Sequence, residues 1–132
     1  MTTILLIHSL LRWLIILLAI VAIIKFTLGW LQNQEFQKAD RAIMGSFVGF
    51  IDLQLLIGLI LLIGYGSYTR HQFEHLFTMV ILLLVVHLLP RRWRDAPAAI
   101  RFRNNLGVII AALVLIVLGV MVLPGNRWAL PF

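Results

Sequence analysis

Two histidines, His8 and His75, are the residues of this chain best suited to bind a cofactor. Each lies about one turn inside a long apolar segment, and the two segments are expected to run in opposite directions. Both imidazoles should therefore lie at a similar depth, near one face of a membrane. An ionisable side chain at that depth is costly and predicts a functional site. Two neutral imidazoles that face each other across a helical bundle can ligate a haem iron from both sides.

Residues near this pair could complete a haem site. Arg12 lies four residues after His8, so it shares a helical face with His8 and could bind the haem propionates. Gly58, at roughly the same depth, could make room for a flat porphyrin. The alternative is that Arg12 pairs with Glu74, and that His8 only forms hydrogen bonds at the level of the lipid headgroups.

Further polar residues lie inside the apolar segments. An axial imidazole needs an acceptor for its second ring nitrogen, which Ser9, Gln54 or a backbone carbonyl could supply. Asp52 and Lys25 lie at comparable depths, and an ion pair between them is the favoured interpretation. The functional alternative for Asp52 is a proton relay to a reduced quinone.

The two remaining histidines are weaker candidates. His87 follows His75 by 12 residues, or about 18 Å along a helix, which permits a second site near the opposite face. His87 could bind a haem through one axial ligand, contact a quinone carbonyl, or extend toward the interface, which is the favoured interpretation. His71 is expected in a turn as a structural or solvated residue, because a His71/His75 metal pair would lack carboxylates.

Four long apolar stretches must position these residues. The 132-residue chain is 62% hydrophobic and 12% charged, with a mean hydropathy of +1.04. A soluble domain is roughly half apolar and a quarter charged. Crossing a hydrocarbon core takes about 20 apolar residues. The sequence therefore predicts an all-α fold, a single transmembrane four-helix bundle over residues 1–132, with helices at roughly 4–31, 43–65, 72–89 and 106–124.

Local signals refine this arrangement. Gly45 and Gly49 form a GxxxG pattern, which predicts a close approach between helices. The glycines around residue 65 are expected to end the second helix, and Pro90 the third. Residues 90–105 are predicted to lie along the membrane interface as a short amphipathic helix. The fourth helix, without charge or histidine, is expected to pack in the bundle, face lipid or dock another subunit.

Charge predicts the orientation. One side of the membrane receives most of the positive charge, from Lys38, Arg41, Arg91, Arg92, Arg94, Arg101 and Arg103. Arg70 and Arg127 lie on the opposite side. The positive-inside rule places the first group in the cytoplasm and both termini outside, with a bacterial plasma membrane as the expected location. The net charge of +6 therefore indicates contact with anionic lipid headgroups rather than nucleic acid.

The chain contains no cysteine, which excludes disulfides, iron–sulfur clusters and thioether-attached haem within it. At HSLLRW, DLQLLIGL and EHLFTM it resembles a family of short four-helix bacterial membrane proteins labelled cytochrome b-like. The resemblance runs along most of the chain and includes KADRAI before the second helix. The resemblance implies b-type haem and electron transfer, and it implies that His8, His75 and His87 are the histidines that take part. Many relatives have a histidine where this chain has Asp52, and this departure argues against a second haem.

Together these features predict a membrane cytochrome b-like protein that carries one non-covalent haem b. It would transfer single electrons between a membrane quinone and a partner, and whether it does so as a subunit of an oxidoreductase stays open. One alternative is a haem-free structural or assembly subunit of a respiratory or photosynthetic complex, which would bind other membrane subunits or a second copy of itself. Another is a single histidine that ligates the magnesium of a chlorophyll-type pigment.

Overall fold

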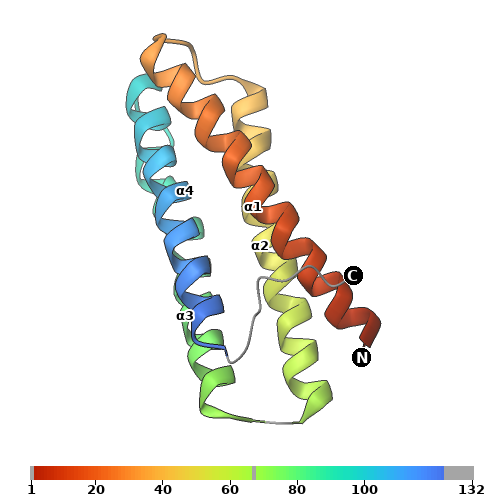
Figure 1. Ribbon diagram of the computed structural model, residues 1–132. Helices are drawn as coiled ribbons and strands as arrows, with labels where there is room; N and C mark the ends of the chain where they lie inside the picture. Colours follow the sequence, from red (N-terminus) through yellow and green to blue (C-terminus); the bar gives the residue numbers. More distant parts are fainter. Residues whose placement is uncertain (1, 67, 124–132) are drawn as a thin grey trace.

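The computed structural model describes residues 2–66 and 68–123, which form four α helices and one short 3-10 helix (Figure 1). These are α1 (Thr2–Leu31), α2 (Lys38–Tyr65), α3 (Arg70–Leu88), η1 (Pro90–Trp93) and α4 (Ala98–Met121). The predicted all-helical fold is confirmed. Four helices, the third counted through η1, have the length and apolar composition to cross a membrane.

The helices form an antiparallel ring. Consecutive helices pack side by side, and α1 also packs against α4, which leaves α1 and α3 diagonal to each other. The start of α1, the end of α4 and the turn between α2 and α3 lie at one end of the bundle, which we call the terminal end (Figure 1). The other two connections lie at the opposite end, the basic end.

Most helix ends carry a recognisable local signal. α1 ends with Asn33 at φ 53°, and the amide of Gln34 donates to the carbonyl of Gly29 over 3.0 Å. α2 ends as predicted, at Gly66 with φ 66°, a conformation that favours glycine. α2 begins at Lys38, earlier than predicted, so the KADRAI segment is helical.

The predicted interfacial helix over residues 90–105 is wrong. Pro90 does end α3, but only the short η1 follows, and α4 begins at Ala98. The first turns of α4 belong to the bundle because Phe102 is fully buried and Asn105 is 5% exposed. Asn105 also accepts a hydrogen bond from Trp93 Nε1 over 2.7 Å, which ties η1 to α4. The fourth helix therefore includes two arginines and is not free of charge.

Small residues let α1 and α4 approach closely. Ala19 and Ala22 of α1 and Ala112 of α4 are fully buried. A Cβ added to Gly29 would lie 2.6 Å from the ring of Phe102. A side chain at Gly29 is therefore incompatible with this packing, and close contact between small residues is a usual basis of helix association in membranes.

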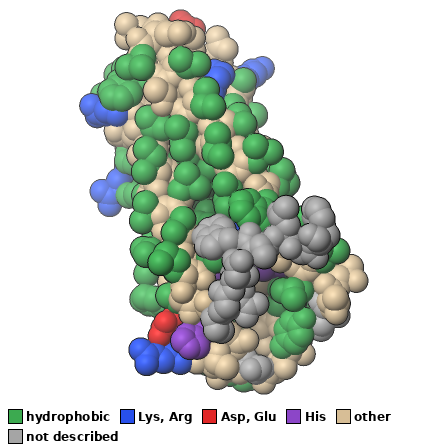
Figure 2. Space-filling model, in the orientation of Figure 1, with side chains coloured by type: hydrophobic (Ala, Val, Ile, Leu, Met, Phe, Trp, Pro, Cys, Tyr) green, Lys and Arg blue, Asp and Glu red, His purple; other side chains and the backbone are tan. Residues whose placement is uncertain are grey.

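The outer surface is strongly apolar. Large hydrophobic side chains stay exposed on every α helix, including Leu17 (57%), Ile63 (70%), Phe77 (68%) and Met121 (68%). Figure 2 shows hydrophobic side chains over most of one face, with most of the visible Lys and Arg toward the basic end. Such a surface suits contact with lipid hydrocarbon and places the charged groups toward the headgroups.

Candidate functional site

His8 lies near the start of α1, and its half-buried ring packs against α2. The ring atom Cε1 would be 3.3 Å from a Cβ added at Gly58, so the glycine gives the imidazole its space. Gln54 Nε2 donates a hydrogen bond to the His8 backbone carbonyl over 2.7 Å. The predicted common depth of His8 and Gly58 agrees with this packing, whereas Gln54, expected as a possible acceptor for the ring, binds the His8 backbone instead.

Two buried polar atoms at this level have no hydrogen-bond partner among the residues that the structure describes. They are His8 Nδ1 and Gln54 Oε1. A buried polar atom left in this state costs roughly 1–3 kcal/mol. Such atoms are uncommon in folded proteins and indicate a bound water or ligand.

His75, near the start of α3, is oriented by α4. Its Nδ1 lies 2.6 Å from the carbonyl oxygen of Gly119. Because a carbonyl oxygen only accepts, Nδ1 must carry the proton, and in the neutral ring the lone pair lies on Nε2. Gly119 is in the last turn of α4, where carbonyls lack a helical donor. The bond thus caps α4 and fixes the ring in the way that metal-bound histidines are fixed.

The structure brings His8 and His75 to the same end of the bundle on diagonal helices. The expectation that their two segments run in opposite directions is wrong, because α1 and α3 both begin at the terminal end and run in the same direction (Figure 1). This common direction is what gives the two histidines a similar depth. The two rings are close enough for a charge on one to repel a charge on the other, and His8 has the same relation to Arg12. The Arg12 guanidinium carbon also lies 5.6 Å from the centroid of the Trp13 ring. The His8 ring packs on α2, and the His75 ring is held by α4.

For the neighbouring residues, one interpretation changes and another holds. The pairing of Arg12 with Glu74 is wrong, because Glu74 Oε1 accepts from Arg70 Nε over 2.7 Å one turn away. His71 has a structural role, since its Nδ1 lies 3.0 Å from the carbonyl oxygen of Val122, just after α4. Among residues 2–66 and 68–123, no group of three or more His, Cys, Asp or Glu could hold a metal ion.

A second polar pair joins α2 and α3 deeper in the bundle. His87 Nε2 lies 2.6 Å from Asp52 Oδ1, and the two side chains are 36% and 43% exposed. The predicted Asp52–Lys25 pair is therefore wrong. Lys25 Nζ lies 2.8 Å from Oδ1 of Asp40, which is fully buried in the first turn of α2. Asp40 faces the last turns of α1, whereas Asp52 faces α3.

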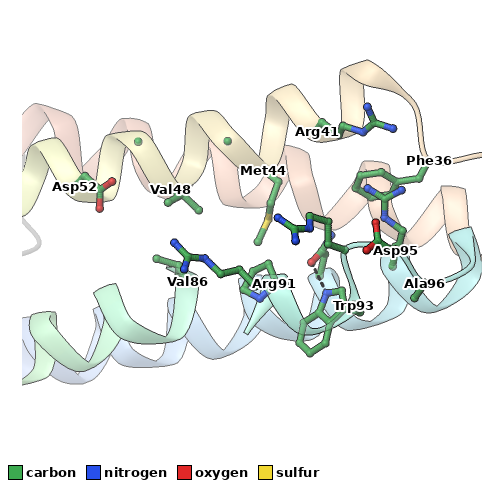
Figure 3. Close-up of a pocket in the computed structure, with 16 residues that line it drawn as sticks. Phe36, Arg41, Met44, Val48, Asp52, Val86, Arg91, Trp93, Asp95 and Ala96 are labelled. Carbon is green, nitrogen blue, oxygen red and sulfur yellow. Dashed lines mark hydrogen bonds between the residues drawn. The ribbon is translucent and has the colours of Figure 1, made fainter. Parts of the chain in front are cut away.

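A cleft of about 850 Å³ opens at the basic end, between α2 on one side and α3, η1 and α4 on the other (Figure 3). Four arginines from both sides line it: Arg41, Arg91, Arg94 and Arg101. Figure 3 shows Met44, Val48 and Asp52 directed from α2 toward the space above α3. The cleft therefore combines a mouth with four arginines and Asp95, apolar walls, and the carboxylate of Asp52 deeper along α2.

The GxxxG pattern lines this cleft. A Cβ added at Gly45 or Gly49 would meet no atom within 4 Å, and both residues belong to the cleft wall. The predicted close helix approach at these glycines is therefore wrong among the described residues. The missing side chains instead leave open space along α2.

Comparisons of the chain with protein-family models, with curated proteins and with solved structures found no match.

Proposed function

We propose that this protein is a membrane cytochrome b-like electron carrier that binds one haem b between His8 and His75. The proposal rests on the hydrogen bonding of the polar atoms at the terminal end of the bundle. Buried His8 Nδ1 and Gln54 Oε1 lack partners there among the described residues, while the Gly119 carbonyl places the lone pair of the neutral His75 ring on Nε2. The resemblance at HSLLRW and EHLFTM points to the same two histidines.

The chain's own residues have separate roles in this proposal. His8 and His75 would hold the haem iron, Arg12 would supply a cation for the propionates, and Gly58 leaves room beside the His8 ring. A bound haem b supplies a one-electron couple, whose potential depends on the axial ligands and the surrounding polarity. The apolar helices exclude water from the site and lower the local dielectric.

The membrane arrangement follows from the charge distribution. The four arginines of the cleft lie at the basic end, which we place in the cytoplasm of a bacterial cell. The histidine pair then lies near the outer face. A membrane-dissolved quinone and a second protein are the proposed electron partners, because both can reach a carrier that is embedded in the bilayer.

An absorption spectrum tests the haem proposal. The purified, haem-supplemented protein should show a reduced-minus-oxidised b-type α-band, and His8→Ala or His75→Ala should each abolish it. His71→Ala is the matched control, because it also removes a histidine bond to the end of α4 but should keep the band. A folded protein without a band, or a band that survives both ligand changes, rules the proposal out.

One observation favours a second function, that of a haem-free structural subunit. His71 and His75 both bond to carbonyls at the end of α4, which gives each a role in packing without any cofactor. In that case the protein should co-purify with larger membrane subunits and show no haem band. His71→Ala and His75→Ala should then lower the stability by similar amounts.

A further inference from the structure

Asp52, which lines the cleft and is hydrogen-bonded to His87 behind it, is a residue whose position the membrane topology does not explain. Arginines at the mouth are what the positive-inside rule requires of a cytoplasmic end. Asp52, however, lies 11 residues beyond Arg41, or about 16 Å deeper along α2. An exposed carboxylate at such a depth is costly in a membrane and marks a functional site by default.

The pair presents a hydrogen-bond acceptor to the cleft. Asp52 lines the cleft, and its Oδ1 accepts from His87 Nε2. Its second oxygen, Oδ2, makes no hydrogen bond within the described part of the chain. An acceptor between apolar walls selects a ligand that dissolves in the membrane and carries a hydroxyl donor.

The wall next to Asp52 suits a flat ring. Gly49 lies nearly one helical turn before Asp52 on the cleft wall, and it has open space where a side chain would be. Gly58 lies six residues after Asp52, so the pair and the His8 ring are separated by about 9 Å along α2. A ring beside Gly49, nine residues before Gly58, would thus lie roughly 14 Å along α2 from the level of the His8 ring.

We propose that the cleft binds a quinol, the reduced form of a membrane quinone. One ring hydroxyl donates to the Asp52 carboxylate, the ring lies beside Gly49, and the hydrocarbon tail extends from the open cleft into the bilayer. His87 holds the carboxylate in place through its Nε2 proton. The choice of a quinol rests on the proposed electron-transfer function, whereas the binding site rests on the cleft and the Asp52–His87 pair.

An anionic phospholipid fits the cleft less well. Its phosphate would match the arginines at the mouth, such as Arg41 and Arg101. Its acyl chain would then lie against Asp52 and leave the carboxylate without a donor, which is costly in an apolar setting. A lipid would therefore contact the arginines at the mouth of the cleft but would leave Asp52 without a hydrogen-bond donor.

Calorimetric titration of the full chain tests the site. The protein is placed in phosphatidylcholine nanodiscs, kept reduced with ascorbate under argon, and titrated with decylhydroquinone or with its dimethyl ether, which has no donor. Empty nanodiscs correct for partitioning into lipid. We expect decylhydroquinone to bind about tenfold more tightly than the ether, which corresponds to one hydrogen bond to a charged group.

Two pairs of variants sharpen the test. Asp52→Leu should remove the preference for the hydroquinone, whereas Asp52→Asn, which keeps an acceptor oxygen, should retain part of it. Gly49→Leu should fill the cleft and abolish binding of both probes. Gly107→Leu is its matched control, because Gly107 also has open space around it but lies outside the cleft, and binding should stay within twofold of the wild type.

Several outcomes would overturn the site. If Asp52→Leu keeps the preference for the hydroquinone, the carboxylate is not part of the binding site. If the Gly49 and Gly107 variants bind the probes equally well, the cleft is not the binding site. If phosphatidylglycerol displaces the hydroquinone from the wild type but not from Arg41→Gln/Arg101→Gln, the cleft is a lipid site. Hydroquinone binding by a protein without a haem band would contradict the cytochrome function alone. A haem band without hydroquinone binding would contradict this site alone.

Discussion

At the scale of single residues, the four histidines differ in what they bond to. His71 and His75 each bond to a backbone carbonyl at the end of α4, and His87 bonds to a carboxylate. His8 has a buried Nδ1 for which the described residues provide no partner. Sequence position shows that these side chains lie near or within the membrane, but it does not show these partners, since every one of them is contributed by another helix.

Asp40 is the residue whose loss should destabilise the fold most clearly. Its carboxylate binds Lys25 over 2.8 Å and accepts from the Gln37 amide over 2.9 Å. We expect Asp40→Ala to lower the free energy of unfolding by about 1.5–3 kcal/mol, because it removes charge-assisted hydrogen bonds from a fully buried group. Denaturant unfolding in detergent micelles measures the change.

Glu74→Ala provides the comparison for that measurement. Glu74 also pairs with a cation, but Arg70 and Glu74 are 89% and 39% exposed. Exposed pairs contribute little, so the change should stay within about 0.5 kcal/mol of zero. Equal losses for the two variants would mean that burial does not set the strength of the Asp40 bonds.

At the scale of helices, local sequence signals predicted some of the helix ends correctly and missed others. Gly66 and Pro90 end α2 and α3 as predicted, because the positive φ of the glycine and the missing N–H of the proline act within a few residues. The start of α4 was missed because its first turns are polar, and the burial of Phe102 and Asn105 against other helices does not show in local hydropathy. The Asp52–Lys25 pair failed for a related reason, since depth alone does not give the rotation of a helix about its axis.

The contact between α1 and α4 predicts a strong effect at one glycine. Gly29→Ala places a methyl group where the Phe102 ring lies, so we expect a loss of about 1–3 kcal/mol in unfolding free energy. Gly107→Ala is the control on α4 itself. It meets no atom within 4 Å and should be neutral or slightly stabilising, because alanine favours helix more than glycine does.

Thermal unfolding of the two glycine variants in the same detergent gives the comparison. A Gly29 variant as stable as the Gly107 variant would show that α1 and α4 can separate slightly without cost. In that case, the buried alanines rather than the glycine would determine how closely the two helices pack.

At the scale of the whole molecule, the four-helix membrane bundle could be predicted from composition and apolar segment length. The order of helices around the ring could not, and it makes the His8 and His75 helices diagonal rather than adjacent. The cleft was also not predicted, because a GxxxG pattern usually indicates helix contact. Here Gly45 and Gly49 lie on the wall of the cleft, where an added Cβ would meet no atom within 4 Å.

The absence of native cysteine allows a direct test of orientation. Arg92→Cys lies in η1 at the basic end, and Tyr68→Cys lies in the turn at the terminal end. In intact cells that carry the protein in the plasma membrane, a membrane-impermeant maleimide should label the Tyr68 variant and spare the Arg92 variant until that membrane is opened. The reverse pattern would place the basic end outside and the histidine pair on the cytoplasmic side.

The open seam between α2 and α3 determines how a ligand would reach the interior. These two helices contact each other less than any other neighbouring pair of α helices does, and the cleft opens between α2 and the end of α3, η1 and the start of α4. A molecule dissolved in the bilayer could enter sideways, by diffusion within the plane of the membrane, without passing through water. Occupancy would then follow the mole fraction of the ligand among the lipids rather than its aqueous concentration, so even a weak site would be well filled by an abundant membrane component.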